Sequence, residues 1–134
     1  MNYWLIKSEP ETFSWQDLVK KGWSCWDGVR NYQARNNLKA MKKGDQALFY
    51  HSVIGTCVVG IAKVSKEFYP DPTIDDERWV AVDVVPYKEF KNPVLLSVIK
   101  QSPELKDIHL VRQGRLSVMP LKKEEFDIIV KMGK

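Results

Sequence analysis

The sequence predicts a small α+β domain with a curled, partly closed mixed sheet. Segments typical of strands and of helices are interspersed along the chain, without the regular strand–helix–strand alternation of a doubly wound sheet. The chain has 134 residues, of which 44% are hydrophobic and 28% charged, as in ordinary globular domains. A chain of this length buries enough surface to fold without a disulfide or a metal ion. We therefore expect one domain over residues 1–134.

Two helices are predicted in the first third of the chain. Residues 15–21 follow a Ser14–Asp17 capping signal and stop at Gly22. Residues 31–43 form the clearest helix, because apolar side chains recur at positions i, i+4 and i+7 along one face. The residues of this buried stripe are Ala34, Leu38 and Met41.

Strands and the remaining helices follow from alternation, β-branched residues and the positions of proline and glycine. The predicted strands are residues 2–8, 45–52, 57–69, 78–87 and 114–119. The composition of residues 70–77 indicates a loop. Asn92-Pro93 and Ser102-Pro103 are interpreted as the starts of two short helices that end near His109, because proline is favoured at the first helical position. Residues 122–132 form a terminal amphipathic helix.

Several kinds of site are poorly supported. Cys25 and Cys57 form no CxxC pair, and His51 and His109 have no partner at metal-ligand spacing. Neither a nucleophile elbow nor a phosphate-binding glycine loop is present, so we expect no metal ion and no cofactor. No apolar run approaches the ~18–20 residues that span a bilayer. We expect an intracellular protein, cytoplasmic or, in a eukaryote, nuclear, with no membrane partner. The oligomeric state is left open, and a monomer is the default expectation.

The use of arginine is more informative than the net charge of +4, which permits an anionic partner without requiring one. Sixteen basic residues are Lys and only five are Arg. Four of the Arg fall in two short segments, as Arg30 with Arg35 and Arg112 with Arg115. A guanidinium group suits phosphate oxygens and base edges better than an ammonium group does. The alternative for each Arg is an internal ion pair or a cap on backbone carbonyls.

Polar side chains gather where the predicted apolar strands end. These groups are Lys7, Ser8 and Glu9 after the first strand, His51 and Ser52 after the second, and Arg112, Arg115 and Ser117 around the last. Each group alone is also compatible with a structural role. If the strand ends share one rim, these residues converge with Trp26, Arg30 and Asn31. A pocket with an aromatic wall, amides, hydroxyls and flanking Arg suits a heteroaromatic ring such as a nucleobase.

Five tryptophans provide candidates for the aromatic wall. Trp4, Trp15 and Trp79 sit in regular apolar patterns, which favours the core for each of them. Trp26 differs, because it lies at a turn beside Asp27-Gly28 with little sequence-local core to join. Trp26 is therefore the preferred wall.

The chain contains the segments YWLIKSEPETFS, WDGVRNYQARNNLKAMKKGDQALFYHS, VVGIAKV with FYPD, and LVRQGRLSVMPLKKEEFD. Together these segments, which run from Tyr3 to about Val130, resemble the EVE domain, the PUA-like module of the thymocyte nuclear protein family. The resemblance implies a PUA-like pseudo-barrel, in which a curled mixed sheet is surrounded by short helices. It also implies a binding module without catalysis, whose expected ligands are modified cytosines in DNA.

EVE domains are also similar to YTH domains, which hold methylated adenosine in an aromatic cage. By that analogy, Trp26 is the expected cage wall, with Lys7, Ser8 and Asn31 beside it. The implied function is to read a methylated or hydroxymethylated cytosine, with the four clustered Arg on the nucleic-acid backbone. One alternative is an RNA reader that uses the same pocket. Another is a small PUA-like hydrolase of a modified nucleoside, in which Lys7, Glu9 and His51 act as acid and base groups.

Overall fold

A six-stranded mixed sheet forms the centre of the computed structural model, which describes residues 1–134. The strand order is β2-β5-β4-β3-β1-β6. β1 runs parallel to β3, and every other neighbouring pair is antiparallel. The strands are β1 (Tyr3–Ser8), β2 (Ser24–Trp26), β3 (Gln46–His51), β4 (Cys57–Pro70), β5 (Val80–Leu95) and β6 (Val118–Leu121). The helices are α1 (Trp15–Lys21), α2 (Tyr32–Ala40), α3 (Leu96–Gln101), the 3-10 turn Pro103–Leu105, α4 (His109–Arg112) and α5 (Lys123–Met132).

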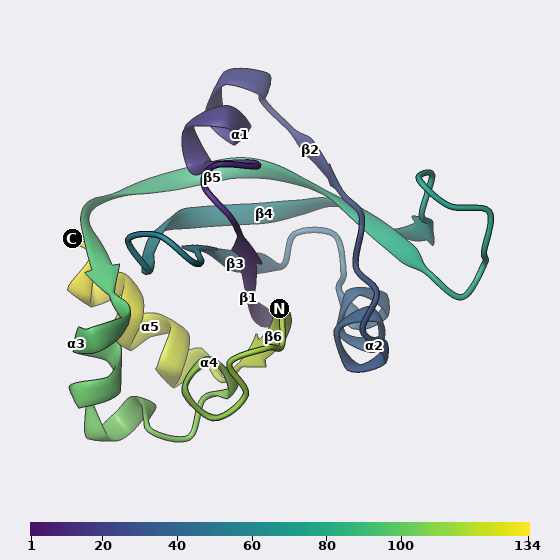
Figure 1. Ribbon diagram of the computed structural model, residues 1–134. Helices are drawn as coiled ribbons and strands as arrows, with labels where there is room; N and C mark the ends of the chain where they lie inside the picture. The colour runs from purple at the N-terminus through teal and green to yellow at the C-terminus, as the bar shows by residue number, and fades with distance from the viewer.

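The short helices surround this sheet in three places (Figure 1). α1 lies above the long strands β4 and β5, and α3, α4 and α5 gather at one end of the sheet. α2 stands at the other end, at the foot of the segment that descends from β2. The turn that follows β1 therefore lies opposite the segment that leads from β2 into α2, on one face of the molecule.

The core is strongly aromatic. Phe49 is fully buried, and its ring centre lies 5.4 Å from that of Trp15 and 5.6 Å from that of Trp26. Both contacts are edge-to-face, the favourable geometry for aromatic pairs. Trp4 and Trp79 are buried too, so the prediction for the three core tryptophans is confirmed. The predicted helical stripe of Ala34, Leu38 and Met41 is also buried.

The largest difference from the sequence prediction concerns β5. This strand runs without interruption through Pro86 and Pro93, so the predicted helix start at Asn92-Pro93 is wrong, and the helix begins instead at Leu96. Pairing with β4 outweighs the local preference of proline, because Val94 and Leu95 lie opposite Val58 and Cys57. The register shifts beside Pro86, which removes the need for a hydrogen bond from its missing N–H.

Other differences are smaller. Residues 24–26 form a short strand against β5 rather than a turn, and the predicted helix over 31–43 is shorter, at Tyr32–Ala40. The last strand starts at Val118, and a one-turn helix, His109–Arg112, was not predicted. The remaining strands, α1 and α5 lie within one or two residues of their predicted bounds. None of the helices combines the length and the apolarity needed to cross a bilayer.

Candidate nucleic-acid interface

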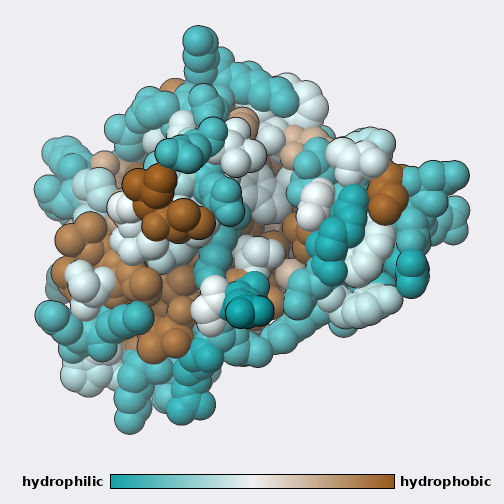
Figure 2. Space-filling view, viewed as in Figure 1, coloured by the Kyte–Doolittle hydropathy of each residue, from teal (hydrophilic) through white to brown (hydrophobic).

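A groove of about 560 Å³ opens between the end of β1 and the segment that leads from β2 into α2. In Figure 2 this groove is the hollow near the middle of the view, and hydrophilic residues line its rim. Its lining comes from three stretches that are distant in sequence: residues 7–13, residues 21–30 and Ser117. The lining residues are Lys7, Ser8, Glu9, Thr12, Phe13, Lys21, Ser24, Cys25, Trp26, Asp27, Gly28, Val29, Arg30 and Ser117.

Trp26 belongs both to the core and to the groove. Its side chain packs edge-to-face against Phe49 and Phe13, with ring centres 5.6 Å and 6.4 Å away. Only 8% of its surface remains exposed, so it presents a fringe to the groove rather than a whole ring face. No buried side-chain nitrogen lacks a partner, and the Trp26 Nε1–H donates to no group of the protein. This N–H therefore keeps access to solvent, as a donor available to a ligand.

A tight turn after β1 presents the polar groups of one wall. The Glu9 carbonyl accepts hydrogen bonds from the N–H groups of Thr12 and Phe13, at 3.0 Å and 2.8 Å. The Ser8 hydroxyl donates to the Phe13 carbonyl, which leaves its oxygen free to accept from a ligand. These bonds fix the backbone of the turn while the Glu9 side chain stays exposed at the rim.

Lys7 is held between this wall and the loop before β6. Its Nζ donates to the Gly114 carbonyl at 2.7 Å and lies 5.8 Å from the ring centre of Tyr50. Burial lowers the pKa of Lys7, because the charged ammonium loses hydration. A cation that is partly stripped of water and has a single protein acceptor retains donors for a further partner.

The opposite wall is fixed by an ion pair whose carboxylate is buried and whose guanidinium is partly exposed. Arg30 donates to Asp71 at 2.9 Å and to the Thr73 hydroxyl at 3.1 Å, and the Gly28 N–H donates to the same carboxylate at 2.9 Å. The Asp71 side chain is fully buried, whereas 36% of the Arg30 side chain is exposed. Burial alone would raise the pKa of Asp71, but hydrogen bonds from Thr73, Arg30 and Gly28 outweigh it and hold the pKa at about 2. The β4–β5 loop thus clamps the β2–α2 segment.

The structure brings Lys7, Ser8, Glu9, Trp26, Arg30 and Ser117 together in the groove, and places Asn31, His51 and Ser52 outside its lining. Asn31 is the N-cap of α2, where its side chain accepts from the Ala34 N–H at 2.9 Å. His51 Nε2 accepts the Trp15 N–H at 3.0 Å, and burial lowers the pKa of His51, which keeps the ring neutral as an acceptor needs. Ser52 donates its N–H to the Ser8 carbonyl at 2.9 Å, so it lies next to a lining residue without lining the groove itself.

The other three predicted arginines are also away from the groove. Arg35 stacks over Tyr32 at 5.0 Å and donates to the Arg78 carbonyl at 3.3 Å. Arg112 pairs with Asp107 at 3.3 Å, with both side chains largely exposed. Arg115 is exposed in the loop before β6. The contact of these three arginines with a nucleic-acid backbone stays a prediction.

Several groove residues were not identified from the sequence. Phe13 and Val29 add apolar surface, Asp27 adds a second carboxylate, and Lys21 adds a cation. Asp71 shapes the site although it lies in a segment whose composition indicates only a loop. The one signal that could have identified it is that an acidic residue in a loop is a potential partner for an arginine elsewhere in the chain.

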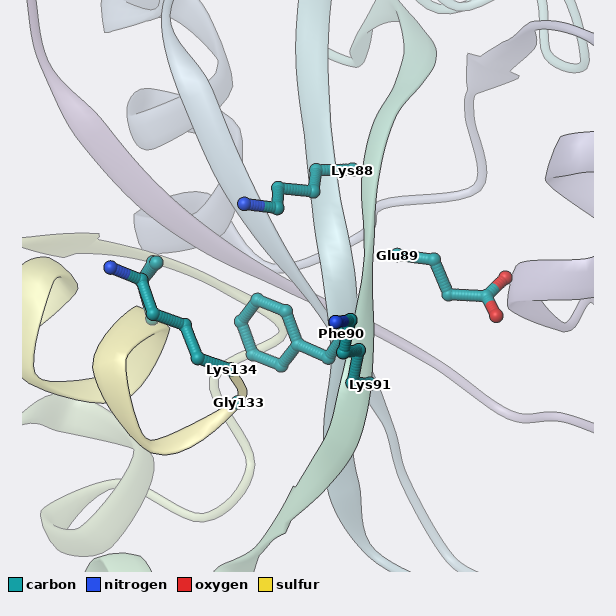
Figure 3. A pocket seen from close by; sticks show the side chains of 7 residues that line it. Lys88, Glu89, Phe90, Lys91, Gly133 and Lys134 are labelled. Atoms are coloured by element: carbon teal, nitrogen blue, oxygen red, sulfur yellow. The ribbon is translucent and has the colours of Figure 1, made fainter.

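A second cavity, of about 290 Å³, lies between β5 and the end of α5. Figure 3 shows the ammonium groups of Lys88 and Lys134 on the same side of the Phe90 ring, while Glu89 points the opposite way. Glu89 instead accepts from the Trp15 indole N–H at 2.9 Å. This cavity offers lysines and one apolar ring, without the mixture of donors and acceptors found in the groove.

The groups in the groove are chemically suited to a neutral, flat, polar ring. Glu9 and Asp27 are acceptors, the Trp26 N–H and Lys7 are donors, and Phe13 and Val29 are apolar. Two carboxylates disfavour a phosphate in the interior, while Lys21 and Arg30 remain to attract one nearby. The fold and the groove together define a small PUA-like binding module built on an open mixed sheet.

Comparison with known proteins identifies the family. A family model described as EVE domain matches residues 2–132, and the chain belongs to the EVE domain family. Thymocyte nuclear protein 1 of Mus musculus is 41% identical in an alignment 168 residues long, which covers 98% of this chain and 73% of that protein. The family and the PUA-like fold expected from the sequence are thereby confirmed.

Solved structures match over the whole chain. A crystal structure of a protein from Agrobacterium tumefaciens has a TM-score of 0.97 and 46% identity, covering 99% of this chain and 93% of that one. Human THYN1, crystallised with DNA that contains 5-methylcytosine, has a TM-score of 0.95 and 36% identity, covering 100% and 98% of the two chains. An ASCH protein from Zymomonas mobilis, at a TM-score of 0.62 and 12% identity, shares the fold alone.

Proposed function

We propose that this protein binds a modified cytosine in DNA, with the base held in the groove beside Trp26. The observation that carries the proposal is the composition of the groove, which offers both acceptors and donors around apolar surface. The human relative crystallised with DNA containing 5-methylcytosine supports the choice of ligand.

The edge of cytosine matches the polar groups of the groove. Its amino group is a donor that a carboxylate such as Glu9 or Asp27 accepts. Its ring nitrogen and carbonyl oxygen are acceptors for the Trp26 N–H, the Ser117 hydroxyl or the Lys7 ammonium. Phe13 and Val29 supply apolar surface for the ring and for a methyl group. Burying one methyl group contributes about 1 kcal/mol, so the preference for methylated over unmodified cytosine is about fivefold.

Binding is proposed without catalysis. The thiol of Cys25 is a groove residue, but burial raises its pKa and disfavours the thiolate that a nucleophile requires. His51, an acid/base candidate in the hydrolase alternative, has its Nε2 engaged by the Trp15 N–H and lies outside the groove lining. The location we propose follows the DNA, in the cytoplasm or, in a eukaryote, the nucleus.

The experiment is a titration of duplexes that differ only in one cytosine, which is unmodified, methylated or hydroxymethylated. Trp26→Ala is a poor test, because loss of a core ring destabilises by roughly 3–5 kcal/mol. Trp26→Phe retains most of the packing and removes the N–H, so affinity should fall about three- to tenfold. Trp23→Phe is the matched control, since Trp23 is 46% exposed and outside the groove.

The outcomes separate the alternatives. Equal binding of the wild-type protein to all three duplexes contradicts the proposal. A ribose strand that binds more tightly than its deoxyribose counterpart favours the RNA reader. Release of a modified nucleoside product, followed by mass spectrometry and lost in Lys7→Ala, favours the hydrolase.

A further inference from the structure

The turn between β3 and β4 carries the most exposed aliphatic side chains apart from the first residue. Val53 is 71% exposed and Ile54 is 53% exposed. The Ile54 N–H donates to the Ser52 carbonyl at 2.8 Å, two residues back in the chain. With a φ of 71° at Val53, this is a γ-turn of the rare, strained kind.

This conformation does not suit the residue that adopts it. Val53 is the one non-glycine residue with positive φ, and a β-branched side chain is a genuine outlier there. Glycine at position 53 would relieve the strain and would expose no apolar surface. Folding alone therefore gives no reason for valine at the tip, and strain of this kind is found where side chains meet a ligand.

The tip stands next to the groove. Ser52 donates its N–H to the carbonyl of Ser8, a groove residue, and Ser8 is the register partner of His51. A strand advances ~3.3 Å per residue, so Val53 and Ile54 lie within roughly 10 Å of that wall. Figure 2 shows the turn as a strongly hydrophobic knob beside the hollow, on the same face of the molecule.

We propose that Val53 and Ile54 form a wedge that enters the base stack of duplex DNA and fills the space vacated by the base bound in the groove. The wedge rests on the proposed function, because it presupposes a base in the groove. A base reaches such a groove from a duplex only by leaving the stack, which costs stacking and pairing energy. Aliphatic side chains inserted at the step offset part of that cost.

The size of the tip favours a base step over a protein partner. Stable protein interfaces bury about 1,200 Å² or more, whereas two aliphatic side chains are enough to open one base step. A duplex that delivers a base to the groove also passes over its rim, where Lys21 and Arg30 provide positive charge. The tip and the groove are therefore two parts of one contact.

The test compares three DNA ligands that carry the same methylcytosine: a paired duplex, the same duplex with an abasic site opposite the methylcytosine, and a single strand. Val53→Gly and Ile54→Ala should each lower affinity for the paired duplex on the order of tenfold. Binding to the other two ligands, in which the base is already unpaired, should stay within about twofold. Val98→Ala, which shortens an exposed aliphatic side chain on α3, should leave all three affinities unchanged.

Two results overturn the wedge: unchanged affinity of both tip variants for the paired duplex, and an equal loss on all three ligands. An equal loss in Val98→Ala also overturns it, because an exposed aliphatic side chain outside the tip would then contribute as much as the tip does. Failure of the proposed function has a different signature, in which the wild-type protein does not distinguish methylated from unmodified cytosine in any ligand. Thermal unfolding of Val53→Gly shows that a loss of affinity does not come from unfolding: because the substitution relieves strain, its melting temperature should not fall below that of the wild type.

Discussion

Replacing Asp71 with asparagine tests the clamp that fixes one wall of the groove. The change keeps the size of the side chain but removes the charge that Arg30, Thr73 and Gly28 contact. A pKa held at about 2 rather than at 3.8 corresponds to about 2 kcal/mol of folded-state stability. Breaking a fully buried pair by removing one partner costs roughly 3–5 kcal/mol, and the cost here is lower because 36% of the Arg30 side chain is exposed. We therefore expect Asp71→Asn to lower the free energy of unfolding by about 2–4 kcal/mol near neutral pH.

The pH dependence gives the sharper check. Because the folded-state pKa of Asp71 is depressed, its contribution is present above the unfolded-state pKa and is lost as pH falls from about 4 to about 2. Urea unfolding of both proteins, at neutral pH and at about pH 3, measures this difference. The reasoning is refuted if the two proteins are equally stable near neutral pH, or if the gap between them does not narrow in acid.

Asp76→Asn is the matched control for this experiment. The pKa of Asp76 is also held at about 2, by hydrogen bonds from Arg78, but that pair is exposed to solvent. Exposed pairs contribute little to stability, so Asp76→Asn should unfold almost as the wild type does. Loss of the clamp should also weaken DNA binding in Asp71→Asn, since Gly28 and Arg30 line the groove.

Two further predictions concern packing and Lys7. In Gly133→Ala the new methyl group would lie 2.6 Å from Phe90 Cγ. We therefore expect a stability loss of roughly 1–3 kcal/mol and a lower melting temperature. In the control, Gly114→Ala, the methyl group meets open space and the melting temperature should not change. Lys7→Met should leave the melting temperature unchanged or higher, because burial lowers the pKa of Lys7 and the charged ammonium therefore opposes folding. The same substitution should weaken DNA binding. A lower melting temperature with intact DNA binding contradicts a role of Lys7 in the groove.

The sequence was most informative where local pattern and tertiary packing agree. The stripe of Ala34, Leu38 and Met41 predicted both α2 and its buried face, because helical periodicity reports burial directly. β5 was predicted too short, because its second half is held by pairing with β4, against the preference of Pro93 for other structure. The three residues of β2 carry too little pattern to reveal a partner that lies almost sixty residues away in sequence.

The candidate site shows the same division. Lys7, Ser8 and Glu9 were found because they follow a clear apolar strand. Trp26 does line the groove, but the expectation that it stands apart from the core is wrong, because its ring packs on Phe49 and only 8% of its surface is exposed. Asn31 and His51 were placed in the site, yet each accepts the N–H of a residue at the start of a helix, Ala34 or Trp15. Composition cannot separate these two uses of an acceptor. Asp71 was missed because its partner, Arg30, is forty-one positions away.

The position of β1 in the sheet has a consequence for how the molecule folds. β1 pairs with β3 on one side and with β6 on the other, so residues from the first and the last strands are neighbours, as with Tyr3 and Leu121. Contacts of such long sequence separation form slowly, because chain entropy is lost before the contacts form. The Lys7 N–H bonds to the Ser117 carbonyl at 3.0 Å, so the groove closes only when this late segment docks. During synthesis, a chain that has not yet reached residue 117 already contains every other residue of the groove lining, but it lacks the segment whose carbonyl accepts the Lys7 N–H.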